Sequence, residues 1–235
     1  MSIKKLREMN LAETKKAIKN SVNEDIIVIN IINTLEEIEK QTNSLVMRLR
    51  DFYKLKHPEA ESRISDNEGL VKNVLSGNKE KSVMGANLGD DEETLQKIAL
   101  MCKELYDTKN FLTKRLESLL QKYAPNMNYL AGATITAKLI REAKSLRKLA
   151  TGKSSTIQML GAEKALFRHL KSGANSPKHG VIVNHQIIQK NKDKGKAARI
   201  LADKISIAAK LDFFKGEFKA PLLVKEIEDK LKWKK

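Results

Sequence analysis

Clustered cations are the residues of this sequence with the clearest chemical potential, because lysine and arginine side chains bind phosphate groups. Lys164, Arg168 and Lys171 follow one another at i, i+4 and i+7, a spacing that places them on one face of a helix. Further along, cations crowd the predicted start of another helix, whose partial positive charge favours a bound phosphate. The candidate anion-binding residues are therefore Gln158, Lys164, Arg168, Lys171, Lys178, His185, Lys194, Lys196 and Arg199.

The formal charge of the chain is unevenly distributed. Residues 1–124 hold 21 Lys and Arg against 20 Asp and Glu, a net charge of +1, whereas residues 125–235 hold 24 against 9, a net charge of +15. A single lysine is ordinarily a solvated surface side chain, but this excess in half of the chain favours a nucleic-acid partner. Because His185, beside Asn184 on a predicted loop, could stack on or hydrogen-bond to an unpaired base, we interpret the candidate residues as RNA-binding.

Composition excludes several other classes of protein. The lone cysteine, Cys102, cannot form an internal disulfide, which suits a reducing compartment, and we expect it to be a buried small apolar residue. The longest apolar run, residues 26–32, is far shorter than the ~20 residues that cross a bilayer. The first ten residues lack the apolar core of a secretory signal.

Catalytic and metal-binding motifs are also missing from the sequence. Gly152-Lys153-Ser154 matches the end of a phosphate-binding P-loop, but Arg147 stands where that loop requires glycine. The histidines at 169, 179 and 185 have no cysteine nearby to complete a zinc site. We therefore predict no catalytic residues, no metal, no cofactor and no enzymatic activity.

Two long helices are predicted in the first half, from Glu24 to Lys56 and after the acidic run at residues 90–93, with Pro58 ending the first. Their apolar positions alternate in steps of 3 and 4, the seam of a coiled coil. The seam of the first helix is Val28, Ile31, Leu35, Ile38, Thr42, Leu45, Leu49 and Phe52. The seam of the second is Leu95, Ile98, Cys102, Leu105, Lys109, Leu112, Leu116 and Leu119.

This pattern predicts an antiparallel coiled-coil hairpin that pairs with a second copy, with Leu105, Leu112 and Leu116 as candidate dimerisation residues. Apolar residues off the seam, such as Ile32 and Val46, would be covered by that copy or by a helix predicted at residues 3–22. The expected segments are an N-terminal helix over 1–23, the hairpin over 24–123 with its tip around 57–90, and a compact domain over 124–235.

Shorter helices are predicted in the basic second half. They span about 136–149, 161–171, 195–210 and 222–231, with a short extended piece at Val181-Ile182-Val183. Few aromatic residues and many helix formers support the same class throughout. The expected fold is all-α: a long hairpin followed by a compact basic helical domain.

Several segments resemble one family, the Nop-domain proteins. The signature of the Nop domain is similar to STIQML at 155–160 and GAEKALFRHLKSG at 161–173. The similarity continues through KHGVIVNH at 178–185 and DKGKAARILADKISIAAKLDFFKGEF at 193–218. The NOSIC segment of the same family resembles RLRDFYKLKHPEAESRISDNEGLVKNV at 48–74. The family includes the archaeal core protein of box C/D small ribonucleoproteins and a spliceosomal cousin.

The resemblance implies a non-catalytic scaffold for guided RNA 2'-O-methylation. It would recognise a kink-turn RNA together with its bound ribosomal-type kink-turn protein and pair with itself through the coiled coil. Gly161, Ala162 and Glu163 would face the partner protein, and the basic residues above would contact RNA. The location implied is the archaeal cytoplasm, or the nucleus and nucleolus of a eukaryote.

The sequence also departs from the family pattern. It starts almost directly at the hairpin, so we expect the fibrillarin-binding domain to be absent, although fibrillarin stays a candidate partner through the resemblance. Gly152-Lys153 and Gln186 stand where relatives usually carry Pro-Ala and Pro, which should alter loop stiffness more than contact chemistry. Two alternatives stay open: a spliceosome-like or pre-rRNA assembly role without methylation, and a coiled-coil module whose basic end binds acidic proteins.

Overall fold

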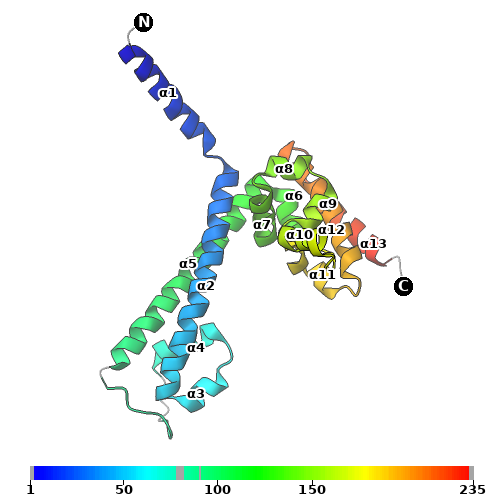
Figure 1. Ribbon diagram of the computed structural model, residues 1–235. Coiled ribbons are helices and arrows are strands. Elements are labelled where there is room, and N and C mark those ends of the chain that lie inside the picture. The colour runs from blue at the N-terminus through cyan, green and yellow to red at the C-terminus, as the bar shows by residue number, and fades with distance from the viewer. Residues whose placement is uncertain (1–2, 78–81, 90, 233–235) are drawn as a thin grey trace. The chain divides into compact units, whose positions relative to one another are not determined.

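The computed structural model describes residues 3–77, 82–89 and 91–232, and in these ranges it contains helices and no strands (Figure 1). The predicted all-α class is confirmed. The chain forms two compact units, one of Met1–Ile32 with Leu116–Lys235 and one of Asn33–Arg115. Because the long helices run through both units, the units divide the chain at different points from the three segments expected from the sequence.

The Asn33–Arg115 unit, which we call the hairpin unit, contains parts of two long helices, α2 (Glu24–Lys56) and α5 (Asp91–Tyr123). They run antiparallel, because Glu39 pairs with Lys109 at 2.9 Å and, 17 residues further along α2 and 17 back along α5, Lys56 pairs with Glu92. Helix α2 has the predicted bounds and ends before Pro58, which begins α3 (Pro58–Arg63).

At several sites the buried stripe of each long helix lies one position away from the predicted seam. In α2 the fully buried residues include Ile32, Val46 and Tyr53, each one position after the predicted seam residue. In α5 the same shift puts Ala99 and Leu120 in the core. At each site two apolar or aromatic residues are adjacent, so spacing alone could not distinguish them. The positions predicted correctly are Val28, Leu35, Ile38, Thr42, Leu49, Leu95, Cys102 and Leu116.

The observed burial corrects two expectations about partners. Ile32 and Val46 lie inside the chain and need no second copy or terminal helix to cover them. Leu116 is fully buried within the chain, so it is unavailable to a second copy. Leu105 and Leu112 are partly exposed and stay candidates for dimerisation.

Cys102 is buried as predicted, in the core of the hairpin unit beside Val46, Leu49 and Tyr53. Burial raises the pKa of its thiol, because the thiolate loses hydration. Helix α4 (Asn67–Ser76) contributes Leu70, Val71 and Val74 to this core, and the carboxylate of its N-cap residue Asp66 accepts from the Gly69 amide at 2.7 Å. Cys102 therefore serves as a structural apolar side chain.

The tip of the hairpin unit is fixed by polar side chains. Arg50 donates to Glu61 at 2.7 Å and to the carbonyl of Ile64 at 2.9 Å. The Glu59 carboxylate accepts from the Ser82 hydroxyl at 2.7 Å and from the amides of residues 83 and 84 at 3.2 and 2.9 Å. The Ser82 hydrogen bond and these amides lower the pKa of Glu59 to about 2. At Gly85 a Cβ would lie 1.8 Å from the Lys56 carbonyl oxygen, so the turn requires glycine.

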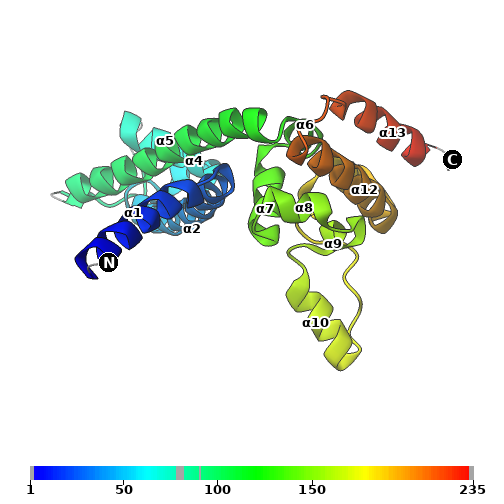
Figure 2. The ribbon, with the colours of Figure 1, turned by 90° about the horizontal axis from the view of Figure 1, so that it is seen from above.

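The other unit holds the basic domain, built around α12 (Lys194–Phe213). Around α12 pack α6 (Pro125–Ala131), α8 (Leu146–Thr151), α9 (Ser154–Met159) and α13 (Ala220–Lys232), as Figure 2 shows. The remaining elements are α7 (Ala133–Ala143), α10 (Glu163–Ser172), the 3-10 helix η1 (Val181–Asn184) and α11 (Gln186–Lys190). The inward face of α12 includes Ala197, Ala198, Leu201, Ile205, Ala208 and Ala209.

Two predictions for this domain are wrong in detail. The single helix expected over 136–149 is two helices, because Lys144 adopts a left-handed conformation with φ of 73°. Ser145 then caps the new helix by accepting from the Lys148 amide at 3.2 Å. The piece expected to be extended at 181–183 is the helix η1, whose Ile182 is fully buried.

Two buried carboxylates hold the domain together. Asp212, near the end of α12, accepts from both nitrogens of Asn126 at 2.9 and 2.8 Å and from the Met127 amide at 2.8 Å. Its pKa is raised by burial, against the lowering effect of these bonds. Asp25 accepts from the Tyr123 hydroxyl at 2.8 Å and the Leu146 amide at 3.0 Å. Both carboxylates thus fix the ends of helices by accepting hydrogen bonds from buried donors.

Helix α1 spans Ile3–Ser21, close to the helix predicted at residues 3–22. All of its side chains from residue 3 to residue 19 are exposed, including Leu6 and Ile18.

Candidate nucleic-acid interface

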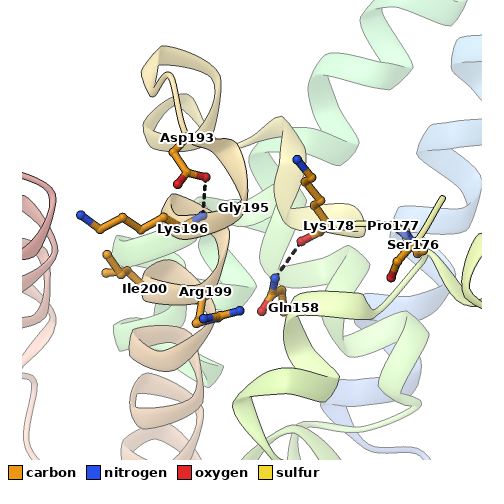
Figure 3. Close-up of a pocket in the computed structure, with 9 residues that line it drawn as sticks. All are labelled: Gln158, Ser176, Pro177, Lys178, Asp193, Gly195, Lys196, Arg199 and Ile200. Carbon is orange, nitrogen blue, oxygen red and sulfur yellow. Dashed lines mark hydrogen bonds between the residues drawn. The ribbon is translucent and has the colours of Figure 1, made fainter.

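A pocket of about 560 Å³ opens at the start of α12 (Figure 3). It brings together four of the predicted RNA-binding residues, which come from α9, from the loop after α10 and from α12. The lining residues are Gln158, Ser176, Pro177, Lys178, Asp193, Gly195, Lys196, Arg199 and Ile200. Residues more than 40 positions apart therefore converge on one polar cavity.

Three hydrogen bonds fix the loop that carries Lys178. The side-chain amide of Gln158 donates to the Lys178 carbonyl at 2.7 Å, and the Gly180 amide donates to the Gln158 carbonyl at 2.8 Å. The Val181 amide adds a third bond, to the Leu160 carbonyl at 2.8 Å. A Cβ at Gly180 would lie 1.9 Å from that carbonyl oxygen, so only glycine allows this approach. Gln158 thus acts first as a positioning residue.

The other wall of the pocket is the first turn of α12. Asp193 caps this helix, since its Oδ1 accepts from the Lys196 amide at 3.0 Å. Arg199 follows one turn later, on the side that faces Gln158 (Figure 3). The start of a 20-residue helix carries a partial positive charge, to which the cations add. This arrangement is suited to a phosphate or another anion.

The pocket cations are free to bind an anion. Among the residues that the structure describes, no carboxylate forms an ion pair with Lys178, Lys196 or Arg199. Asp193 is the one carboxylate in the lining, and its Oδ1 is engaged by the Lys196 amide. The positive charge at this site is therefore not neutralised from within the chain.

A second basic surface lies on α10. Lys164, Arg168 and Lys171 are exposed and share one face, as predicted from their spacing. Beside them the apolar Phe167 and Leu170 are 69% and 73% exposed. Figure 2 shows α10 extending away from α7, α8, α9 and α12, and none of its residues is buried. These cations do not line the pocket.

The three residues expected to face a partner protein form the entry to α10. Gly161 has a φ of 82°, Ala162 caps the helix and Glu163 is its first residue. Glu163 folds back to accept from the Gly161 amide at 2.8 Å. The turn thus has a defined shape, while Gly161 and Glu163 stay exposed.

The structure gives His185 a structural role instead of an open one. Its Nε2 bonds to the Leu130 carbonyl at 3.0 Å, and its Nδ1 accepts from the Ile187 amide at 3.2 Å, which caps α11. Burial lowers the pKa of the imidazole. Because both ring nitrogens are engaged, His185 has no free atom for the predicted hydrogen bond to an RNA base. The other outlying candidate, Lys194, is exposed at the first position of α12.

Some pocket residues escaped the sequence reasoning. Asp193 could have been found, because an aspartate three residues before Lys196 at a helix start is a capping signal. Ser176, Pro177 and Ile200 carry no such signal, since only the fold brings their loop against α12.

Residues 3–77, 82–89 and 91–232 contain neither a candidate membrane span nor a candidate group of metal ligands. No helix there is long and apolar enough to span a membrane. No group of three histidine, cysteine, aspartate or glutamate side chains there could hold a metal ion.

Comparisons with known proteins agree on one family. The model of the family "Nop: snoRNA binding domain, fibrillarin" matches residues 34–90 and 81–233. An uncharacterized NOP5 family protein of Methanocaldococcus jannaschii is 35% identical over 256 residues, covering 97% of this chain and 62% of that protein. Nucleolar protein 56 of Dictyostelium discoideum is 35% identical over 245 residues, covering 89% and 45%. The chain thus spans about half to three fifths of these relatives.

A solved structure gives the same result for the fold. The chain matches a chain of the crystal structure of the fibrillarin/Nop5p complex with a TM-score of 0.63 and 27% identity. The match covers 99% of this chain and 78% of the other.

Proposed function

The chain belongs to the Nop family, and from this premise we propose that it is a non-catalytic RNA-binding scaffold of a box C/D-type small ribonucleoprotein. It recognises a kink-turn RNA together with the ribosomal-type kink-turn protein bound to that RNA. In the assembled particle it supports guided 2'-O-methylation carried out by another subunit. A role in RNA assembly without methylation would use the same RNA surface and differ only in partners.

One observation carries the proposal: the pocket at the start of α12 joins Lys178, Lys196 and Arg199, none of them neutralised by a carboxylate within the described chain. Three cations and a helix start within one cavity suit the phosphates of a backbone held in a fixed, sharply bent path. A straight duplex would not need a concave site.

The exposed helix α10 supports the composite nature of the target. Its cations offer a second phosphate contact, while Phe167 and Leu170 on the neighbouring side offer apolar area that RNA phosphates cannot use. Because one helix carries both a basic and an apolar side, α10 suits a surface that is part RNA and part protein. We assign the turn at Gly161–Glu163 to the protein side of that surface.

Self-association through the hairpin is part of the proposal. Leu105 and Leu112 are partly exposed on α5, and Phe111 between them along the chain is 68% exposed. Burying such side chains against a second copy would remove apolar surface from water. Fibrillarin, which the solved relative's complex contains, is proposed as a further member of the particle.

A gel-shift titration of the full chain tests the proposal. Kink-turn RNA should bind much more tightly in the presence of the kink-turn protein than in its absence. Charge reversal by Arg168→Glu with Arg199→Glu should abolish the complex, whereas circular dichroism should show unchanged helix content. Equal affinity for a straight RNA duplex would contradict the proposal, as would an unaffected double variant.

A further inference from the structure

Two pairs of aromatic rings in contact include residues of the turn between α12 and α13, which lies at the opposite end of α12 from the pocket. Phe214 is 69% exposed and Phe218 54%, and Tyr129 of α6, packed edge-to-face on Phe218 with ring centroids 5.7 Å apart, is 57% exposed. Phe214 makes a similar contact with Phe213 at 5.0 Å. An edge-to-face contact covers few ring faces, so open faces remain at this site. We call Tyr129, Phe214 and Phe218 the aromatic turn.

The exposure does not come from a loose loop. The buried Asn126 side chain accepts from the Lys219 amide at 2.8 Å and donates to the Glu217 carbonyl at 3.4 Å. The Gly216 amide donates to the Leu211 carbonyl at 2.7 Å, which closes the turn. Backbone anchored on both sides holds the rings outward, so their ordering cost on binding a ligand is small.

Charge around the aromatic turn distinguishes the kinds of ligand. Lys210, Lys215 and Lys219 are exposed within ten residues of chain, against one exposed carboxylate, Glu217, which pairs with Lys219 at 3.1 Å. The other acidic residue, Asp212, is buried and serves α6. An apolar peptide would need the rings but not the cations. Rings flanked by cations are the combination that binds unpaired nucleotides, by stacking and phosphate contact.

We propose that the aromatic turn is a second RNA site, which stacks unpaired nucleotides on Phe214, Phe218 and Tyr129. This inference rests on the proposed function and adds a different substrate feature to it. The pocket holds a bent, structured element, and the aromatic turn, ~30 Å away along the 20 residues of α12, holds a single-stranded segment. Stacking accepts any base, so little sequence preference is expected there.

Fluorescence anisotropy with labelled decauridylate and the full chain tests the inference. Phe214→Ala with Phe218→Ala should weaken decauridylate binding about tenfold or more, because base stacking on the rings is lost. The matched control, Phe214→Tyr with Phe218→Tyr, keeps the rings and should bind like the unchanged chain. The dependence of affinity on salt should be the same for all three proteins, since no phosphate contact is removed.

The outcomes separate this inference from the proposed function. Unchanged decauridylate affinity in the alanine variant, or none in the unchanged chain, would overturn the inference even while kink-turn RNA still binds. Loss of affinity for the kink-turn protein alone would make the aromatic turn a protein contact and overturn it too. The proposed function fails separately, when the unchanged chain does not bind kink-turn RNA in the presence of its partner protein.

Discussion

The hairpin unit and the basic domain are both helical, yet the cations of the hairpin unit differ in their pairing from the cations of the pocket. In the hairpin unit many cations have a carboxylate partner, such as Lys72 with Glu68 at 2.8 Å and Lys97 with Glu93 at 2.8 Å. At the pocket of the basic domain the cations have none among the described residues. Cations that are paired with carboxylates leave a solvated surface of little net charge, whereas cations without such partners leave a surface that can bind anions. The lack of carboxylate partners therefore indicates the proposed binding site better than the number of cations does.

The largest difference between the regions should appear on removing their buried polar anchors. Asp212→Ala leaves three buried donors without an acceptor, so we expect the basic domain to lose about 4 kcal/mol of stability. Arg50→Ala in the half-open tip should cost the hairpin unit about 2 kcal/mol. Hydrogen exchange read separately for each unit measures both, with Asp212→Asn as the milder control. A uniform loosening of both units by either change would contradict the comparison.

Charge reversal should separate the regions by RNA affinity. Lys196→Glu with Arg199→Glu places repulsion in the pocket, and we expect kink-turn RNA to bind about a hundredfold more weakly, with a shallower salt dependence. The control Lys72→Glu with Lys97→Glu changes the net charge equally in the hairpin unit and should alter affinity less than about threefold. Similar losses in the two variants would show that binding follows overall charge and not the pocket.

Two glycines make a matched pair. A Cβ would collide with a carbonyl oxygen at 1.9 Å for Gly180 and at 1.8 Å for Gly85, so each alanine variant should lose about 1–3 kcal/mol of stability. Only Gly180→Ala should also weaken RNA binding, by about tenfold, because its loop positions Lys178. Urea denaturation and anisotropy measure the two effects. Weaker RNA binding by Gly85→Ala would assign the hairpin tip to the RNA surface.

Lowering the pH should destabilise the two regions in a fixed order. Of the four predictions, this one has the smallest expected effects. The folded pKa of His185 is below its ordinary value of 6.5, so its stabilising contribution falls as pH drops below about 6.5. Glu59, with a pKa lowered to about 2, keeps its contribution until pH falls below its ordinary 4.5. Exchange of the Ile187 amide should therefore quicken at a higher pH than exchange of the Met84 amide. The reverse order would contradict both assignments.

The sequence predicted the long helices well and their contact faces only in part. Proline at 58 and the carboxylates near 91 are local signals, and the helix bounds follow them closely. The choice between neighbours such as Leu45 and Val46 depends on how two helices meet, which no local signal records. The break at Lys144 was missed because neither glycine nor proline marks this position, where a lysine adopts a left-handed conformation.

The composition of the sequence indicated cations of the candidate site, but the sequence did not show which of them the fold would bring together. Charge concentration indicated Lys178, Lys196 and Arg199, and the fold brings them to one cavity. The sequence could not show that the cations of α10 lie outside the pocket, because helical spacing identifies which residues share a face but not what lies around that face. His185 had the residue type of a base contact, yet the Leu130 carbonyl, 55 positions earlier, engages its ring.

The joint at Asp25 has a consequence for how such chains can vary. A single carboxylate oxygen, Oδ1, receives both the Tyr123 hydroxyl and the Leu146 amide, so both long helices and α8 are tied at one atom. All three residues lie outside 33–115, the stretch that forms the hairpin unit. Whole turns could be inserted into or removed from both arms of the hairpin without disturbing this atom. The length of the hairpin is thus a dimension that evolution, or a protein engineer, can change while the contacts of Asp25 stay as they are.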